Sequence, residues 1–136
     1  MTKMLRGPLP NGYCRMGKIL VVDDQASMRQ IISNMLVERG HTVESVEDGM
    51  SAIDALEKDT FDLIVADVNM PRMDGLEFLK KIKAEKPDSH VVFVTGMLED
   101  TVRLGSENLG VDGLILKPFD ENAAMEVINR ALSISQ

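Results

Sequence analysis

Short apolar runs recur along this chain and alternate with segments in which apolar and polar residues are mixed. A continuous apolar run of this kind is typical of a strand that is buried on both faces of a parallel sheet. The pattern predicts five strands, at Lys18–Val22, His41–Val46, Leu63–Ala66, Val91–Val94 and Leu114–Leu116.

The segments between these runs predict helices. In the first of them, apolar residues stand at positions i, i+3, i+4, i+7 and i+8, which form one face of an amphipathic helix. Gly40 follows this segment and is a typical residue just beyond a helix end. The inward face is expected to consist of Met28, Ile31, Ile32, Met35 and Leu36.

Four further helices are expected. The second follows the turn pair Asp48–Gly49, the third covers about Leu76–Ala84, and the last, capped by its first residue, covers Asp120–Leu132. The fourth, at about Asp100–Leu109, has the weakest apolar stripe. It also contains Gly105, which costs about 1 kcal/mol relative to alanine inside a helix. We therefore expect this fourth helix to be the mobile element of the domain.

Strands and helices alternate strictly in this prediction. The connections between strands are too short for anything but βα units, so the strands are expected to be parallel. A chain of 136 residues has room for one such domain and not for a second. The predicted fold class is α/β, with a single doubly wound, five-stranded parallel sheet.

The first 17 residues have no apolar periodicity. They contain Gly7–Pro8 and Pro10–Asn11–Gly12, which are typical of turns and loops. We interpret residues 1–17 as a disordered N-terminal leader and residues 18–134 as the folded domain. Met16 stands directly before the first strand and is an alternative start of translation.

The composition narrows the classes of molecule that the protein is expected to bind. The formal net charge of -7 opposes nonspecific binding to nucleic acid or to anionic membranes. No apolar run approaches the roughly 20 residues of a membrane span. Cys14 is the only cysteine, which excludes an internal disulfide and fits a reducing cytoplasm. The two histidines, His41 and His90, adjoin predicted strands and are interpreted as surface or strand-edge residues rather than as metal ligands.

Polar residues with chemical potential follow four of the strands. Asp23–Asp24 follow the first, Asp67 the third, Thr95 the fourth and Lys117 the fifth. Ligands of open α/β sheets bind beyond the carboxyl ends of the strands, so these side chains are expected to share one edge. Each residue alone could be a helix cap, a strand-end hydroxyl or a turn residue. Four such strand ends make a much stronger signal than any one.

This combination of residues predicts phosphoryl chemistry. Three carboxylates cannot crowd together in the ionised form without a cation, because each raises the pKa of the others. Hard oxygen ligands favour Mg²⁺, Mn²⁺ or Ca²⁺. A lysine and a hydroxyl beside such a metal form a receptor for a phosphoryl group, and a carboxylate there can itself be the nucleophile.

With these motifs, the chain resembles the receiver domain of two-component response regulators, and most of all stand-alone receivers of the chemotaxis (CheY-like) type. The resemblance extends from Lys18 to about Leu132 and implies a flavodoxin-like (βα)5 fold with strand order 2-1-3-4-5. The motifs that carry it are Val21–Asp24, Asp67–Pro71, Met73–Gly75, Thr95–Gly96 and Lys117–Phe119.

The resemblance also implies a role for each residue at the edge. Asp67 is the expected phosphoacceptor, and the donor is a phosphohistidine on a sensor histidine kinase or a histidine phosphotransfer protein. Asp24 and Asp67 are expected to ligate Mg²⁺ (or Mn²⁺) directly, and Asp23 through water. The backbone carbonyl of Asn69 is expected to supply a further ligand.

Lys117 is expected to bind a phosphoryl oxygen, next to a cis Lys117–Pro118 peptide, and the Thr95 hydroxyl to close on the phosphoryl group. One position departs from the family pattern. Where the family usually has Tyr or Phe, three residues before the lysine, this chain has Leu114. We therefore expect the signal to travel mainly through the segment Gly96–Leu109.

The expected function is that of a stand-alone, monomeric, cytoplasmic receiver that signals by phosphorylation-dependent contact with a downstream protein effector. It is expected not to be an enzyme, beyond catalysing its own phosphorylation and dephosphorylation. Only four residues follow Leu132, so a DNA-binding output domain is not expected. One alternative is a Mg²⁺-dependent phosphatase with an aspartyl-phosphate intermediate, in which an acid would replace Asn69. The other is a phosphorylation-independent interaction module, which would lack one of the acids or the lysine.

Overall fold

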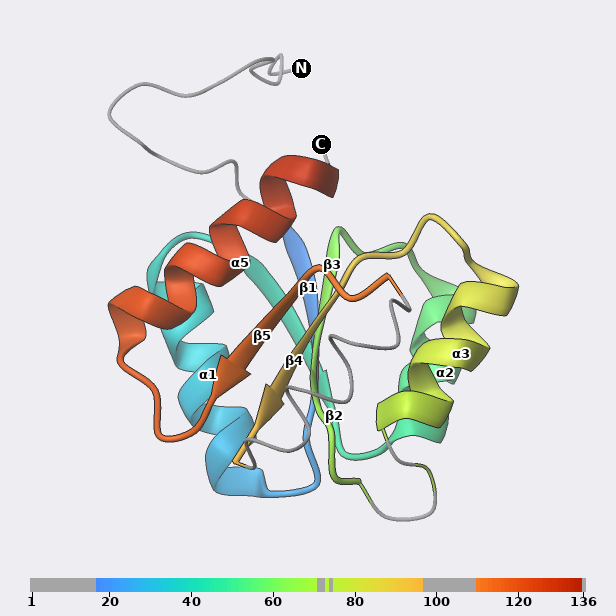
Figure 1. Cartoon of the computed structure of the whole chain (residues 1–136), viewed down its shortest axis with the longest axis horizontal. Coiled ribbons are helices and arrows are strands. Elements are labelled where there is room, and N and C mark those ends of the chain that lie inside the picture. The colour runs from blue at the N-terminus through green and yellow to red at the C-terminus, as the bar shows by residue number, and fades with distance from the viewer. Residues whose placement is uncertain (1–16, 71–72, 74, 97–109, 136) are drawn as a thin grey trace.

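The computed structural model describes residues 17–70, 73, 75–96 and 110–135, which form a sheet with helices on both faces (Figure 1). All five predicted strands are present. They are β1 (Lys18–Val22), β2 (Thr42–Val46), β3 (Leu63–Asp67), β4 (Val91–Thr95) and β5 (Gly113–Leu116). The described helices are α1 (Ala26–Glu38), α2 (Gly49–Lys58), α3 (Gly75–Glu85) and α5 (Glu121–Ser135).

The strands are parallel and lie in the order β2-β1-β3-β4-β5, as predicted. In the sheet, β2 lies beside β1 on one edge. The chain then returns past β1, so that β3 lies beside the opposite edge of β1. Such a reversal opens a crevice outside the carboxyl ends of the two strands beside it. The carboxyl ends of β1 and β3 are therefore the place where the topology favours a site.

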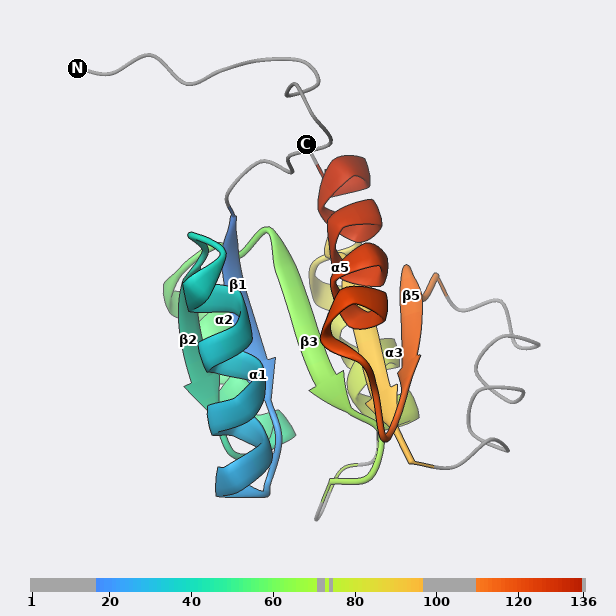
Figure 2. The ribbon, with the colours of Figure 1, turned by 90° about the vertical axis from the view of Figure 1, so that its left-hand side faces the viewer.

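Helices α1 and α5 cover one face of the sheet, and α2 and α3 cover the other (Figure 2). Successive residues of β1 point to opposite faces, because side chains alternate along a strand. Ile19 and Val21 pack in the cluster under α1 and α5, whereas Leu20 and Val22 pack in the cluster under α2 and α3. Burial on both faces is the reason why the central strands appear in the sequence as continuous apolar runs.

Some helix predictions differ from the structure in detail. Ile31 is 51% exposed and was wrongly placed on the inward face of α1, because it lies at the margin of the stripe formed by its buried neighbours. Phe78 of α3 is fully buried, although no core position was assigned to it from the sequence. Helix α5 continues past Leu132 to Ser135.

The interpretation of His41 as a surface residue was wrong. Its side chain is only 6% exposed, and its Nδ1 accepts a hydrogen bond from the backbone N–H of Gly17 at 3.0 Å. Gly17, which the sequence placed at the end of the leader, is itself buried and also accepts a hydrogen bond from Thr42 N–H. His41 therefore helps to hold the start of β1 against the start of β2.

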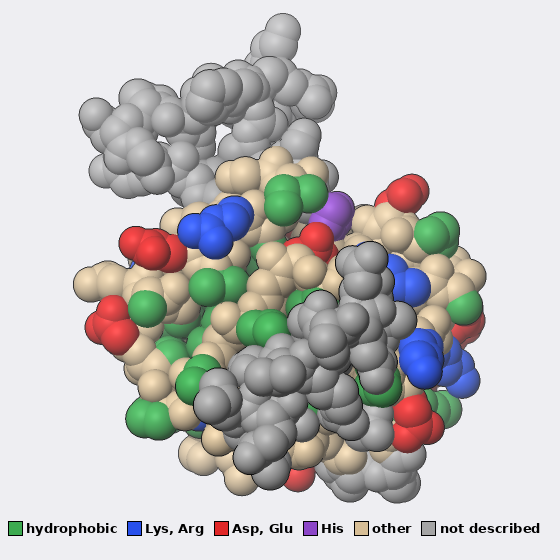
Figure 3. Space-filling model, viewed as in Figure 1, with side chains coloured by type: hydrophobic (Ala, Val, Ile, Leu, Met, Phe, Trp, Pro, Cys, Tyr) green, Lys and Arg blue, Asp and Glu red, His purple; other side chains and the backbone are tan. Residues whose placement is uncertain are grey.

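Two expected segments, the leader up to residue 16 and the helix at Asp100–Leu109, lie outside the described residues. Among the helices that are described, none is both long and apolar enough to cross a membrane. On the face seen in Figure 3, acidic and basic side chains are interspersed over the described part of the chain.

Candidate functional site

The sheet brings the carboxyl ends of β1 and β3 side by side. Val22 is paired with Ala66 in the parallel register, so the next residues, Asp23 and Asp67, leave the sheet at the same level. Asp23 is 1% exposed and Asp67 is 7% exposed, whereas Asp24 is exposed. The predicted convergence of these acids at one edge is thus a property of the strand register.

Carboxylate oxygens of Asp23, Asp24 and Asp67 lie within 4.8 Å of one another. The Asp23 Oδ1 atom accepts a hydrogen bond from Gln25 N–H at 2.9 Å, but its buried Oδ2 atom has no hydrogen-bond partner among the described residues. A buried carboxylate oxygen without a partner is costly unless a cation or a donor meets it. The three residues therefore fit a hard divalent cation, both in their donor type and in their unmet bonding capacity.

Burial raises the pKa of the Asp23 carboxyl above its usual range. The negative charges of Asp67 and Asp24 raise this pKa further, and the Gln25 amide and the Lys117 ammonium oppose the rise. The charged form of Asp23 is thus disfavoured in the metal-free protein. A bound cation relieves this cost, because it attracts the same charges that repel one another.

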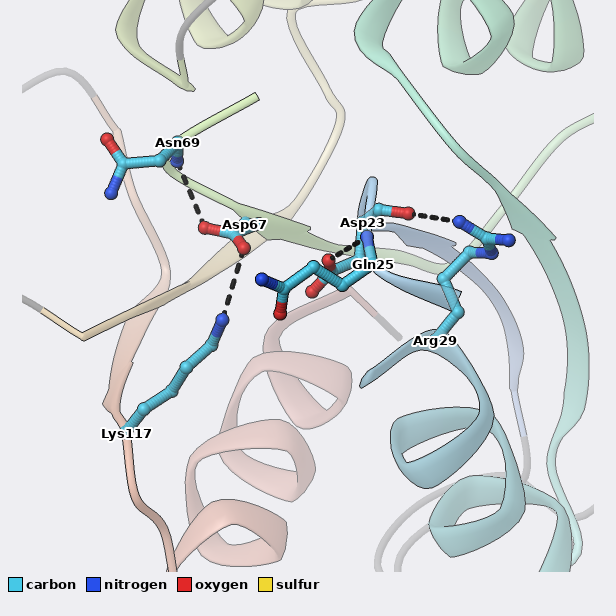
Figure 4. A network of polar contacts seen from close by, with 6 residues as sticks. All are labelled: Asp23, Gln25, Arg29, Asp67, Asn69 and Lys117. Atoms are coloured by element: carbon cyan, nitrogen blue, oxygen red, sulfur yellow. Dashed lines mark hydrogen bonds and ion pairs between the residues drawn. The ribbon is translucent and has the colours of Figure 1, made fainter. Parts of the chain in front are cut away.

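Lys117 contacts Asp67, one of the three acids of the cluster (Figure 4). Its Nζ atom lies 3.1 Å from Asp67 Oδ2, and the backbone N–H of Asn69 donates to Asp67 Oδ1 at 3.0 Å. The Lys117–Pro118 peptide is cis, as the resemblance implied. One carboxylate therefore receives an ammonium on one oxygen and an amide on the other.

Thr95 ends β4, beside β3, and its side chain is fully buried. Its backbone carbonyl accepts a hydrogen bond from Lys117 N–H at 2.7 Å. The end of β4 is thereby tied to the first residue after β5. Thr95 thus lies at the carboxyl end of β4 and Lys117 directly after β5, on the two strands that follow β3 across the sheet and at the edge where the sequence predicted them.

The loop after Asp67 needs a glycine where it meets α3. A Cβ atom added to Gly75 would lie 2.8 Å from Val68 Cα and 3.0 Å from the Phe93 ring. The N–H of Gly75 also donates to the carbonyl of Val68. Gly75 thus allows the start of α3 to pack directly against the residue that follows Asp67.

Residues 19–129 match the family of response regulator receiver domains. The chain belongs to this family. Response regulators of this family are the signalling proteins of two-component systems. CheY-like receiver domains such as this one are therefore signalling domains. The recognition made from the sequence motifs is therefore confirmed.

Individual relatives of this receiver support the same assignment. It is 35% identical to the chemotaxis protein CheY-3 of Vibrio cholerae over 116 residues, which cover 83% of this chain and 89% of that protein. The fold matches NtrX of Brucella abortus with a TM-score of 0.82 and 30% identity, over 89% of this chain and 28% of NtrX. The receiver thus corresponds to about a quarter of that longer protein.

A third relative was solved with ligands. The response regulator TrrA of Thermotoga maritima, in complex with Mg²⁺ and BeF, matches with a TM-score of 0.78 and 28% identity. The match covers 85% of this receiver and 99% of TrrA.

Two contacts of the receiver's acid cluster were not expected from the sequence. Gln25 N–H donates to the Asp23 carboxylate, and Arg29 Nη1 donates to the Asp23 backbone carbonyl at 2.7 Å (Figure 4). The available signal for Arg29 is a basic residue in the first part of a predicted helix, five positions after the acid Asp24. Such a residue opposes the preference for negative charge near a helix N-terminus, so it needs a local reason to be there.

Proposed function

We propose that Asp67 accepts a phosphoryl group from a phosphohistidine of a sensor histidine kinase or a histidine phosphotransfer protein. The observation that carries this proposal is the 3.1 Å contact between Lys117 Nζ and Asp67 Oδ2, inside a cluster of three carboxylates. An ammonium group beside a carboxylate nucleophile is suitably placed to bind an oxygen of the incoming phosphoryl group.

The proposal includes a Mg²⁺ ion, for which Mn²⁺ can substitute. Asp24 and Asp67 bind it directly, Asp23 binds it through water, and the Asn69 carbonyl supplies a further ligand. The close carboxylates and the unpartnered Asp23 Oδ2 support this assignment. The presence of Mg²⁺ in the complex of the related TrrA supports it as well.

In the proposed transfer, an oxygen of Asp67 forms a bond to phosphorus while the phosphorus–nitrogen bond of the donor breaks. The electron pair of that bond goes to the imidazole nitrogen, and because the other ring nitrogen of the donor carries a proton, the ring leaves as neutral histidine. Lys117 moves its ammonium group from Asp67 to a phosphoryl oxygen, and the Thr95 hydroxyl donates to another. The metal, when bound, offsets negative charge on the phosphoryl oxygens. The domain thus contributes positioning and charge, which is most of what phosphoryl transfer requires.

The proposed role is signalling through a change of protein contacts rather than turnover of a substrate. The downstream partner is a protein effector, and the receiver acts as a monomer in the cytoplasm without nucleic-acid or membrane binding. The net charge of -7 supports the assignment without nucleic-acid or membrane binding, and the single cysteine fits a reducing compartment. Self-catalysed phosphorylation and dephosphorylation are the only reactions assigned to it.

Intact-mass measurement with acetyl phosphate and Mg²⁺ tests the proposal. We expect a gain of one phosphoryl group in the wild type, none in Asp67→Asn, and none in the wild type when Mg²⁺ is chelated. Asp62→Asn is the matched control, because the Asp62 carboxylate accepts a hydrogen bond from the backbone N–H of Lys18 at the start of β1 and is not part of the acid cluster. Undiminished labelling of Asp67→Asn, or loss of labelling only in Asp62→Asn, would overturn the assignment of Asp67.

A further inference from the structure

The loop between β1 and α1 carries two of the three clustered acids, Asp23 and Asp24, on a single turn of chain. The second of these acids is exposed, and no side-chain cap holds the start of α1, because the capping residue is Gln25 without a side-chain cap hydrogen bond. Something else must therefore fix the direction of the two carboxylates.

Arg29 provides such a contact. Its Nη1 atom lies 2.7 Å from the backbone carbonyl oxygen of Asp23, six residues earlier in the chain. The same arginine is anchored in α1 by its own N–H, which donates to the carbonyl of Gln25 at 3.0 Å. The guanidinium group thus ties the acid-bearing loop to the first turn of the following helix.

From this geometry, we propose that Arg29 is a positioning residue for the acid pair that holds the divalent cation. The inference rests on the proposed function, because it concerns the site assigned there to Mg²⁺. Arg29 does not touch the reacting atoms, and it acts through the peptide that joins Asp23 to Asp24.

The bonds around Asp23 leave one atom free for a ligand. Its N–H donates to the carbonyl of Val46 at 3.2 Å, its Oδ1 accepts from Gln25, and its carbonyl accepts from Arg29. Among the described residues, the buried Oδ2 atom has no partner. Two of these three bonds hold the backbone of Asp23 and one holds its carboxyl group, so this oxygen is the one left available to a ligand.

The contact of Arg29 also constrains the neighbouring acid. The carbonyl of Asp23 and the N–H of Asp24 belong to one planar peptide unit. Fixing the carbonyl fixes the orientation of this plane and the position of the Asp24 Cα atom. A single guanidinium group thereby constrains the backbone at both acids.

Arg29 acts through the backbone carbonyl of Asp23 and not through an ion pair with the Asp23 side-chain carboxylate. The cation that lowers the pKa of the Asp23 carboxyl is Lys117, on the other side of the cluster. The role of Arg29 should therefore depend on its planar, hydrogen-bonding head. Lysine carries the same charge on a different donor geometry, so the two side chains are not equivalent here.

Calorimetric Mg²⁺ titration of the full chain tests this proposal. We expect Arg29→Met to bind Mg²⁺ at least about tenfold more weakly than the wild type, which is typical when a partner behind a metal ligand is lost. Arg29→Gln, which keeps a donor, should recover part of this loss, and Arg29→Lys should not recover all of it.

Arg39→Gln is the matched control. Arg39 follows α1, bonds the carbonyl of Met35 and pairs with Glu121, away from the acids. Its loss should leave the Mg²⁺ affinity unchanged. An equal loss in Arg39→Gln, or an unchanged affinity in Arg29→Met, would overturn the positioning role.

Amide NMR spectra of the metal-free protein provide a second readout. In Arg29→Met, the resonances of Asp23, Asp24 and Gln25 should shift more than those around Asp67, while the remaining spectrum stays that of a folded protein. Unchanged resonances in this loop would contradict the inference even if Mg²⁺ binding fell. If the wild type bound no Mg²⁺ while these shifts occurred, the metal assignment would fail and the bracing of the loop by Arg29 would stand.

Discussion

Aspartates stand at both edges of the sheet, and their oxygens are used in different ways. At the amino edge, Asp62 Oδ2 accepts a hydrogen bond from the N–H of Lys18 at 2.7 Å, where β1 begins. Asp112 does the same for Val91, where β4 begins, with Oδ2 at 2.8 Å from the amide nitrogen. Each of these carboxylates fulfils a structural demand, because the first amide of a strand would otherwise lack a partner.

At the carboxyl edge, the carboxylates face one another instead. Asp23 keeps a buried oxygen without a partner, and Asp24 contributes an exposed carboxylate to the same cluster. The comparison teaches that residue type and position at a strand end do not separate structure from function. The separating features are that three carboxylates lie within 4.8 Å of one another and that one buried oxygen, Asp23 Oδ2, has no partner among the described residues, since unmet capacity is what a ligand can use.

The largest effect that would sharpen this comparison concerns metal affinity at the carboxyl edge. We expect Asp24→Ala to weaken Mg²⁺ binding about a hundredfold and Asp23→Ala about tenfold, because a direct ligand contributes more than one acting through water. Calorimetric titration of both variants measures the difference. Equal losses would reject this ranking of the two acids.

A smaller effect is expected at the amino edge, in stability rather than in binding. Asp112→Ala leaves the Val91 N–H without its acceptor and should lower the free energy of unfolding by about 1–3 kcal/mol. Asp112→Asn keeps a carbonyl oxygen and should lose less. Urea unfolding measures both variants. A fall in Mg²⁺ affinity comparable to that of Asp23→Ala would break the division between the two edges.

At the carboxyl edge, removing a charge should have the opposite effect on stability. The pKa of Asp23 is raised by burial and by its neighbours, so at neutral pH its charged form opposes folding of the metal-free protein. Asp23→Asn should therefore raise the free energy of unfolding by up to about 1 kcal/mol without metal. Saturating Mg²⁺ should reverse the order, because a cation that binds the folded wild type more tightly than the folded variant stabilises the wild type more.

Urea unfolding with and without Mg²⁺ checks this reversal, and Asp24→Asn serves as the control. Asp24 is exposed, so its neutralisation should stabilise the metal-free protein less. If Asp23→Asn were destabilising without metal, the Oδ2 atom would have a partner that the cluster does not explain.

Much of the carboxyl edge could be predicted from the sequence, because strand ends follow from apolar runs and parallel strands share their ends. Asp67 and Lys117, 50 positions apart, were placed at one edge in this way. The hydrogen bonds at the amino edge could not be predicted in this way. They join residues that are 44 and 21 positions apart, and no recurring sequence pattern marks them. The same limitation explains Arg29, whose role depends on the direction of one carbonyl in a loop.

His41 shows this limitation most clearly, because a polar residue before an exposed edge strand does not indicate burial. Its neighbours in space are Gly17, which is the last residue of the predicted leader, and charged residues of two other segments. The hydrogen bond from Gly17 N–H requires a lone pair on Nδ1, so His41 must be neutral to accept it. His41 therefore belongs with the aspartates of the amino edge that fulfil a demand of the backbone.

The smallest of the expected effects follows from this neutral histidine. Burial and the nearby charge of Arg39 lower the pKa of His41 below its usual range, and Asp62 partly opposes the shift. The unfolded chain then binds a proton more readily than the folded one, so stability is complete above about pH 6.5 and declines as the pH falls below it. Uptake of one proton limits this decline to about 1.4 kcal/mol per pH unit. Thermal unfolding between pH 7.5 and 5.5 should therefore show a steeper loss in the wild type than in His41→Gln, which cannot titrate there. Equal slopes for the two proteins would mean that His41 is already solvated in the folded state, and the amino edge would lose one of its satisfied contacts.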